Sequence, residues 1–245
     1  MRKFLYALIL IVLACSSSFA LSDAEYKVLM KNKSFAAADK ALNSAWKDAT
    51  GMLYGSDMDN LKKNQQQWIK TGRDREAQAL INRNKLSKAE AYAQVTNARA
   101  DYIMQYVRDN TDPYERLAYS MTKIARQISQ STKPSAQSGK VKAWSGKNYI
   151  VVFEVDGKES YLARFWTNSK QHVFDDSYYT GMRLSDVKNY LEDAGYEDDT
   201  TYSVGGNKQV VEFGINGNTV SYIDFIQSDI PIPAKIQNLL DKYEK

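Results

Sequence analysis

The apolar residues of this 245-residue chain change their spacing near residue 130, and this change limits the folds that the chain can adopt. Before that point apolar residues recur every three or four positions, which is the spacing of one face of an α-helix. After it, short runs of β-branched and aromatic residues are separated by glycines and other turn residues, which is typical of strands. We therefore expect two domains: an antiparallel helical bundle, and then an α+β domain with an antiparallel sheet and one or two helices.

Three helix starts are marked in the first half. Ser22 with Glu25 and Ser87 with Glu90 have the spacing of capping boxes, in which each side chain satisfies a free backbone N–H of the other residue. Asp112-Pro113 combines an N-cap acceptor with a proline at the first helical position. These signals predict that several separate helices build the first domain.

The boundary between the domains is expected just after the last of these helices, whose apolar stripe runs from Leu117 to Ile128. Residues 129 to 140 read SQSTKPSAQSGK, which is linker composition. The expected organisation is a signal peptide at 1–20, a helical domain at 21–128, a linker at 129–143 and an α+β domain at 144–245.

The second domain is expected to contain five strands and two helices. Asp156-Gly157 is a hairpin turn signal between the first two strands. The expected strands cover 149–155, 161–166, 201–204, 209–215 and 219–226, and the expected helices cover 184–194 and 234–243.

The first twenty residues have the order of a secretory signal, with Arg2 and Lys3 before an apolar run and small residues after it. Two processing routes stay open. Ser18-Phe19-Ala20 fits cleavage before Leu21, whereas Val12 to Cys15 resembles a lipoprotein box that would lipidate Cys15. A periplasmic or secreted protein is expected in either case, with the membrane reached only through a lipid anchor.

The chain is poor in the side chains that carry most catalysis. One Cys and one His, His172, exclude disulfides, thiolate zinc sites and multi-histidine metal sites. No nucleophile lies at a recognisable spacing from a base. We therefore expect no enzyme activity, no cofactor and no metal.

Charge is divided unequally along the chain. Residues 21–134 carry 19 basic and 13 acidic side chains, and residues 135–245 carry 12 basic and 16 acidic ones. An exported protein seldom meets nucleic acid, and no basic stripe is evident, so a nucleic-acid partner is not expected. The opposite halves are either unrelated solvated surfaces or two different binding surfaces.

Residues 144–243 contain 16 aromatic side chains, most of which are expected in the core. Tyr178 and Tyr179 are consecutive, and neighbouring residues of an extended chain point to opposite faces. We expect at least one of the two to be an exposed contact for a protein or a carbohydrate.

Residues 35–80 and 89–103 carry polar and aromatic residues in an order that resembles the bacterial LprI-like family, over about residues 25–107. This family consists of small exported helical domains named for a lysozyme-inhibiting member. The matching residues are Ala38-Asp39, Leu42-Asn43, Trp46, Gln65, Trp68, Arg73-Asp74, Thr96 and Arg99. The resemblance implies that the first domain binds a protein, with lysozyme as the model partner.

The chain departs from the family pattern in three ways. It lacks the cysteines that usually flank these motifs, and Trp46 replaces the usual Tyr. Gly72 lengthens the spacing between Trp68 and Arg73-Asp74 by one residue.

Two interpretations of the matching residues stay open. Asp39, Asn43 and Trp46 share one helix face, and Arg73-Asp74 lies one to two turns beyond Trp68. These side chains either pin helices together through a half-buried ion pair or form a recognition patch for a partner. The expected binding residues are accordingly Asp39, Asn43, Trp46, Trp68, Arg73, Asp74, Tyr178 and Tyr179.

The segment from Thr180 to Val187 is similar to the Gly-Met helix opening of small envelope-lipoprotein domains. Together the resemblances imply an exported envelope protein that binds a protein partner and inhibits lysozyme or a related cell-wall-degrading enzyme. The alternative is a scaffold module that binds peptidoglycan or another envelope protein. Because lysozymes are commonly cationic, the acidic half is the better contact surface for one.

Overall fold

The computed structural model describes residues 21–154, 160–166, 174–175, 177–191, 195–206, 209–227 and 231–242. The expected fold class, helices followed by α+β, is confirmed. Internal contacts divide the chain into two compact units between Thr111 and Asp112, and each unit is described by itself.

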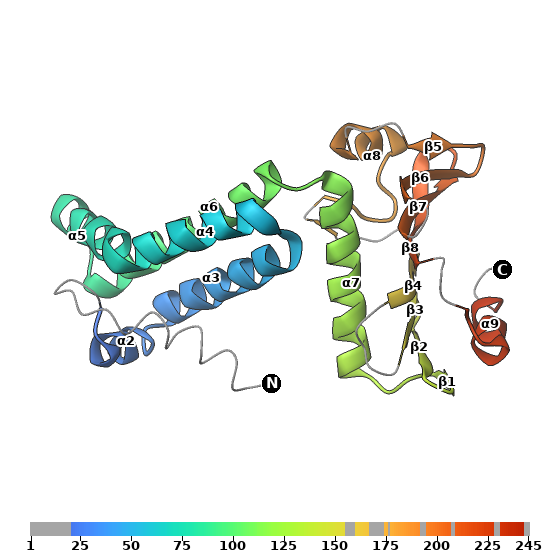
Figure 1. The fold of residues 1–245 in the computed structure, drawn as a ribbon, viewed down its shortest axis with the longest axis horizontal. Helices are drawn as coiled ribbons and strands as arrows, with labels where there is room; N and C mark the ends of the chain where they lie inside the picture. The colour runs from blue at the N-terminus through green and yellow to red at the C-terminus, as the bar shows by residue number, and fades with distance from the viewer. Residues whose placement is uncertain are drawn as a thin grey trace. The chain divides into compact units, whose positions relative to one another are not determined.

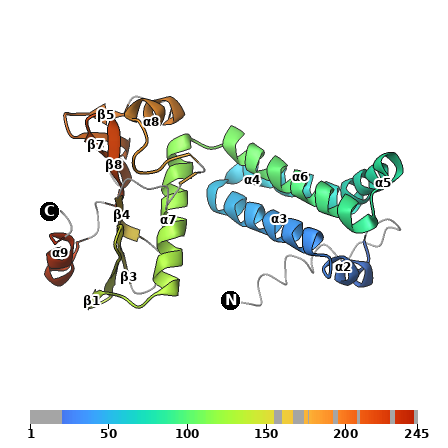
Figure 2. The same ribbon diagram turned by 180° about the vertical axis from the view of Figure 1, so that it is seen from behind.

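The first unit is helical. Its elements are α2 (Asp23–Leu29), α3 (Lys33–Met52), α4 (Gly55–Gln67), the π-helical turn η1 (Trp68–Gly72), α5 (Arg73–Asn84) and α6 (Lys88–Asp109) (Figure 1). Both predicted capping boxes form, at Ser22 before α2 and at Ser87 before α6. The longest helix, α6, packs against α3 and α5, and Figure 2 shows the same helices from behind.

Small side chains let these helices approach closely. Ala38 and Ala49 of α3, Ala77 of α5 and Ala91 of α6 are all buried. Phe35 fills the space at one end of α3, and the rings of Tyr26 and Tyr92 pack edge-on against it with centroid distances of 5.8 and 6.5 Å.

The π-helical turn lies where Gly72 lengthens the motif spacing. A helix can accommodate one additional residue as a single wide turn, and such turns are frequent at functional sites. Here the backbone stays helical from α4 through η1 into α5. A Cβ at residue 72 would lie 2.9 Å from Cδ1 of Trp68, so the turn brings the indole ring close to the backbone at a residue without a side chain.

The second unit contains one antiparallel sheet. Its elements are α7 (Pro113–Ser131), β1 (Ala136–Ser138), β2 (Val141–Ser145), β3 (Tyr149–Glu154), β4 (Ser160–Trp166), α8 (Leu184–Leu191), β5 (Tyr196–Glu197), β6 (Thr201–Gly206), β7 (Gln209–Asn216), β8 (Thr219–Gln227) and α9 (Ala234–Leu240). The strand order is β1-β2-β3-β4-β8-β7-β6-β5. β8 therefore joins two meanders by pairing with β4, for example at Ala163 and Phe225.

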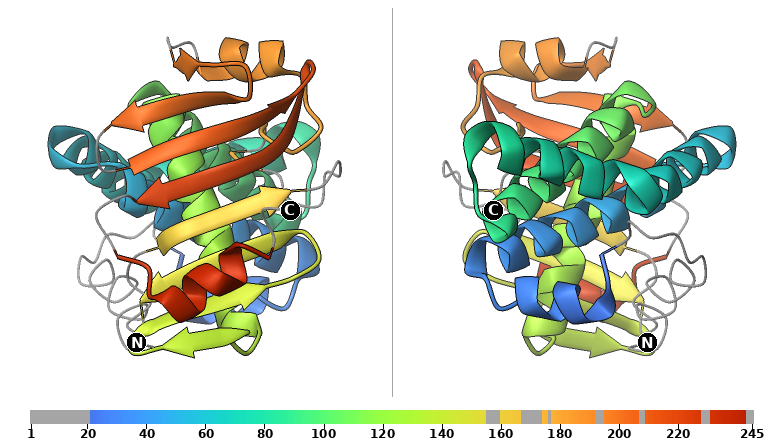
Figure 3. Two further views of the ribbon diagram at one scale, coloured as in Figure 1. Left: turned by 90° about the vertical axis from the view of Figure 1, so that its right-hand side faces the viewer. Right: turned by 90° about the vertical axis from the view of Figure 1, so that its left-hand side faces the viewer.

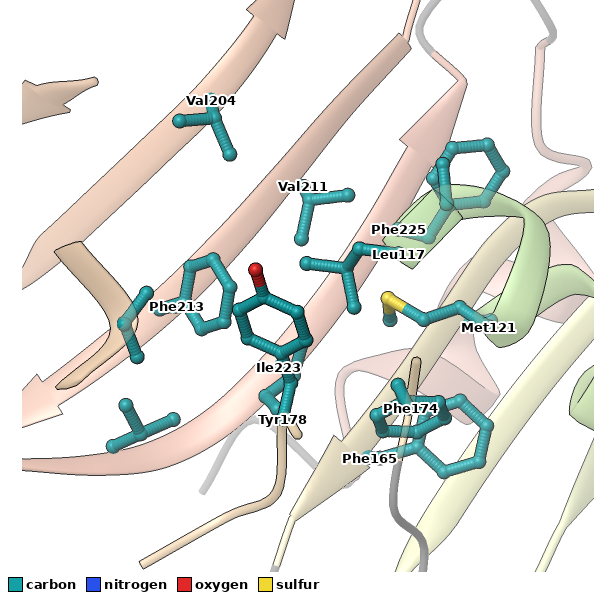
Figure 4. Close-up of a cluster of buried hydrophobic side chains, with 14 of the residues drawn as sticks. Leu117, Met121, Phe165, Phe174, Tyr178, Val204, Val211, Phe213, Ile223 and Phe225 are labelled. Carbon is teal, nitrogen blue, oxygen red and sulfur yellow. The ribbon is translucent and has the colours of Figure 1, made fainter. Parts of the chain in front are cut away.

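Helices cover both faces of this sheet. α7 and α8 pack on one face over a continuous aromatic core, of which Figure 4 shows Met121, Phe165, Phe174, Phe213 and others. On the opposite face Ile236 and Leu240 of α9 pack on β2 and β3 (Figure 3). Both faces of β3 are therefore buried. Val151 belongs to the core under α7, and Val152 belongs to the core under α9.

The division of the chain differs from the expected one at α7. Its apolar stripe, including Leu117 and Met121, lies in the core of the second unit, whereas we expected it in the helical domain. The expected linker at 129–143 contains the end of α7, β1 and part of β2. A stripe at helical spacing predicts that one face is buried, and it carries no information about which element buries it.

The charge balance shifts with this division. Residues 21–111 carry 15 basic and 11 acidic side chains, and residues 112–245 carry 16 basic and 18 acidic ones. The first unit has a net charge of +4 and the second of −2, so the opposite signs persist at smaller size.

Several expectations lie outside the described residues. They are the signal segment with Cys15, the turn Asp156-Gly157 and His172. Strands β1, β2 and β5 were not expected. Helix α8 is described as far as Leu191, and α9 ends at Leu240, before the expected end at residue 243.

Candidate functional site

The candidate site is built from the motif residues of the first unit, beginning with Asp74 at the start of α5. Its Oδ1 accepts hydrogen bonds from Arg73 Nε at 3.1 Å and from the Tyr92 hydroxyl at 3.0 Å, and its Oδ2 accepts one from the backbone N of Leu21 at 3.1 Å. Only 11% of the Asp74 side chain is exposed. One carboxylate thus ties α5 to α6 and to the segment before α2.

Asp39 forms a second centre on α3. Its carboxylate accepts a hydrogen bond from Asn43 Nδ2 at 2.9 Å and interacts with the Tyr26 hydroxyl. Burial raises the pKa of Asp39, and these two donors and the charge of Arg73 act against that rise. Tyr26 and Tyr92 both pack on the ring of Phe35, so the two carboxylates lie in the same part of the first unit; we refer to the polar contacts of Asp39 and Asp74 as the polar network.

Arg99 of α6 forms a third centre, around the π-helical turn. Its guanidinium donates from Nε to Gln65 Oε1 at 2.6 Å and from Nη2 to Asn64 Oδ1 at 2.7 Å. It also lies 5.4 Å from the Trp68 ring and 4.5 Å from the Tyr102 ring. Burial lowers the pKa of Arg99, because amide oxygens and ring faces replace water around the charge.

Two contacts hold the indole of Trp68: Arg99 lies over its ring, and Glu76 accepts a hydrogen bond from its nitrogen. Its indole Nε1 donates to Glu76 Oε2 at 3.1 Å, across the π-helical turn. The ring is buried, so it contributes to the packing of α4, α5 and α6 and offers little surface to a partner.

The motif residues therefore fall into two groups. Asp39, Arg73, Asp74 and Trp68 are buried or half-buried within contacts between helices. The side chain of Asn43 is exposed on α3, and Trp46 is half-buried one turn further along. The half-buried Arg73–Asp74 ion pair lies within α5, and the contact that joins helices is the hydrogen bond from Tyr92 of α6 to Asp74.

Sequence reasoning missed the hydroxyl partners of both carboxylates. Tyr26 follows Ser22 by four residues and Tyr92 follows Ser87 by five, so each lies in the second turn of a helix that begins with a capping box. Their positions resemble ordinary apolar helix positions. Burial raises the pKa of both tyrosines above its ordinary value, so both hydroxyls keep their protons and remain donors.

The second unit places its two consecutive tyrosines differently from each other. Tyr178 is 1% exposed and packs on Tyr190 and Phe213, with centroid distances of 5.9 and 6.1 Å. It is a core residue, and its ring is not available to a partner. Tyr179 is half-buried against the same core.

Two other tyrosines are the exposed aromatic residues of the second unit's described part. Tyr190 on α8 is 50% exposed and Tyr196 on β5 is 73% exposed. Lys188 of α8 forms an ion pair with Glu197 of β5 and lies over the Tyr202 ring, so the two elements are fixed to each other. We name the exposed residues Tyr190 of α8 and Tyr196, Glu197, Asp198 and Asp199 of β5 and the chain just after it the tyrosine–acid surface.

Chemistry based on a metal has no candidate among the described residues, since no three His, Cys, Asp or Glu side chains gather there as ligands. Within the same ranges, no helix combines the length and apolar character needed to span a bilayer.

Comparison with known families gives a match within the helical region. Residues 22–103 match the model of the family described as lysozyme inhibitor LprI. The match covers α2 to most of α6, and so it includes all three centres described above. No curated protein and no solved structure matches the chain.

Proposed function

We propose that this chain is an exported bacterial envelope protein that binds another protein, and that it inhibits lysozyme or a related cell-wall-degrading enzyme. The observation that carries this proposal is the family match over residues 22–103. The secretory pattern of the first twenty residues supports a periplasmic or secreted location.

The contacts within the first unit support binding over catalysis. Arg99 donates hydrogen bonds to two residues of α4, and Asp74 accepts hydrogen bonds from Tyr92 of α6 and from the Leu21 backbone. Groups held in this way are suited to keeping a surface rigid, and a rigid surface loses little conformational entropy on binding.

Charge favours the second unit as the first point of contact with a cationic enzyme. Residues 184–200 carry six acidic side chains and one basic one, and that basic residue, Lys188, is paired with Glu197. Exposed tyrosines among charged residues are common in protein interfaces. The tyrosine–acid surface therefore suits a cationic lysozyme, whereas the first unit, with its charge of +4, would repel it at long range.

The first test is an assay of cell-wall lysis by a purified lysozyme with increasing amounts of this protein. We expect lysis to fall at micromolar excess of the protein. Undiminished lysis in that range would remove the inhibitor proposal.

Two matched tyrosines locate the contact surface. Tyr196 and Tyr54 are each 73% exposed, the first in the second unit and the second in the first unit. We expect Tyr196→Ala to weaken lysozyme binding about tenfold, as removal of an interface aromatic residue does, and Tyr54→Ala to leave the affinity within about twofold. The reverse order would place the contact on the helical unit.

Asn43 and Trp46 are the candidate contacts on that helical unit. Both belong to the matched family region and lie at the surface of α3. If Trp46→Ala lost inhibition at an unchanged melting temperature, α3 would be part of the surface that contacts the partner. The inhibition by Tyr196→Ala, measured in the same assay, is the comparison.

A scaffold that binds peptidoglycan is the second candidate, and the α4–α6 face favours it. Tyr102 is exposed beside the ring of Tyr106, and the exposed amides Asn60 and Asn64 lie on α4. Ring faces and amide groups suit sugar hydroxyls and C–H groups. Co-sedimentation with insoluble peptidoglycan, reduced in Tyr102→Ala, would support this function.

A further inference from the structure

The backbone N of Leu21 is the least expected partner in the polar network. It lies 3.1 Å from Asp74 Oδ2, although the two residues are 53 positions apart. Asp74 Oδ1 is already occupied by Arg73 and Tyr92, so this bond completes the hydrogen bonding of a carboxylate that is largely buried.

The side chain of Leu21 fixes the position of that nitrogen. Leu21 is 8% exposed and packs in the same apolar cluster as Phe35 and Leu29. It directly precedes the N-cap Ser22, and Tyr26, the fourth residue after that cap, lies in the same cluster. An apolar residue before the cap that packs with the fourth helical residue is a hydrophobic staple, which sets the entry angle of the chain.

The chemical nature of this nitrogen depends on processing. In an uncut or Cys15-lipidated chain it is a neutral amide with one N–H. Hydrolysis of the Ala20–Leu21 bond by a signal peptidase adds one water, leaves a carboxylate on Ala20 and converts the Leu21 nitrogen to an ammonium group. Beside Asp74 such a group adds the attraction between an ammonium and a carboxylate to a hydrogen bond that the carboxylate charge already strengthens.

We propose that the Ala20–Leu21 bond is the processing site, and that the freed Leu21 ammonium pairs with Asp74 to complete the polar network of the mature helical unit. The small residues Ser18 and Ala20 at the positions before the bond agree with this site. The proposal is independent of lysozyme binding and chooses between the two processing routes.

The elements around the Leu21–Asp74 pair carry further charged groups. Asp74 and Arg73 lie on α5, Asp39 on α3, Glu25 on α2 and Lys88 on α6, and Glu25 pairs with Lys88. Among these groups, Asp74 is the carboxylate in direct contact with the Leu21 nitrogen.

The first experiment is the intact mass of the protein exported from bacteria. We expect a chain that begins at Leu21 and carries no lipid. A lipidated chain beginning at Cys15, or cleavage at any other bond, would overturn the proposal.

The second experiment tests the pair itself, with chains that begin at Leu21 or at Ala20. The Ala20 chain keeps Leu21 N as an amide and displaces the ammonium by one residue. We expect the Leu21 chain to melt about 4 °C or more higher at pH 6. A carboxylate raises the pKa of an amine, so this advantage is complete below the ordinary amine range near 8 and disappears as the pH rises toward 10.

Asp74→Asn is the control in both chains. Without the carboxylate, we expect the two start points to give the same melting temperature at pH 6. Equal melting of the Leu21 and Ala20 chains with Asp74 intact would overturn the pairing, even if the mass began at Leu21.

Discussion

The two units of this protein are stabilised in different ways. In the first unit closely packed alanines bring helices together, and a network of carboxylates, tyrosine hydroxyls and arginines fixes their positions. In the second unit one continuous aromatic and aliphatic core lies between the sheet and α7. Polar networks depend on geometry and on the identity of each partner, whereas an apolar core depends mainly on volume.

This difference explains why the helical half has a recognisable signature. A polar contact such as Asp74 with Tyr92 depends on the identity of both residues, so an apolar residue of similar volume cannot replace either one. The core of the second unit can be built by many apolar combinations, which agrees with a family match that ends at residue 103.

The largest expected effect tests which unit contains α7. Met121 is fully buried in the second unit's core, so Met121→Ala should lower that unit's free energy of unfolding by about 2–5 kcal/mol. Hydrogen exchange, followed separately on peptides of each unit, measures the effect. Exposed Gln127→Ala on the same helix is the control, and a loss of protection confined to residues 21–111 would contradict the assignment.

A smaller loss is expected when the polar network is broken. Arg73→Gln removes the charged partner of half-buried Asp74 and should lower the first unit's free energy of unfolding by about 1–3 kcal/mol. Exposed Arg75→Gln, two residues away, should change it by less than about 0.5 kcal/mol. Unchanged stability in Arg73→Gln, together with lost binding, would favour the recognition patch over the pin.

Deletion of Gly72 should have a milder effect. Because the π-helical turn accommodates one additional residue, the shorter chain can continue as a regular α-helix with α5 in nearly the same register. Chemical unfolding should show a change within about 1 kcal/mol, as for a substitution outside the core. Deletion of Gln78 within α5 rotates all later residues of that helix, and we expect it to unfold the first unit.

The smallest effect concerns pH. Hydrogen bonds from Lys88 and Ser22 lower the pKa of Glu25 from 4.5 to about 2. A lowered folded-state pKa contributes stability above the unfolded-state value, and the contribution is lost as pH falls from about 4.5 toward 2. Melting temperatures of the wild type and Glu25→Gln should differ slightly at pH 6 and converge near pH 2; a constant difference would contradict the ion pair.

Much of the fold could be predicted from local patterns. The capping boxes at Ser22 and Ser87 form, and the helices followed by an antiparallel sheet are present. The partner of α7 could not be predicted, because Leu117 and Met121 show the same spacing on a helix that packs on helices or on a sheet. Short strands such as β1 lie in a serine-rich segment, where pairing with β2 overrides local preference.

The charged residues of the candidate site could be predicted from the sequence, but most of the residues that contact them could not. Arg73 and Asp74 do form a half-buried pair, but Tyr92 and Leu21 reach Asp74 from distant parts of the chain. Alternation along an extended chain separates Tyr178 from Tyr179 without saying which of them faces the core. The structure places Tyr178 inside, and the exposed aromatic surface lies at Tyr190 and Tyr196.

The position of β8 in the sheet has a consequence for the order in which the two units fold. The first unit joins helices that follow one another closely, so it can fold as soon as α6 has been synthesised. The sheet cannot be completed until residues 219–227 have emerged, because β8 connects β4 to β7, and α9 follows later still. Until then β4 presents an unpaired edge, so the second unit is the part of the described chain that is exposed to wrong strand pairing for longest.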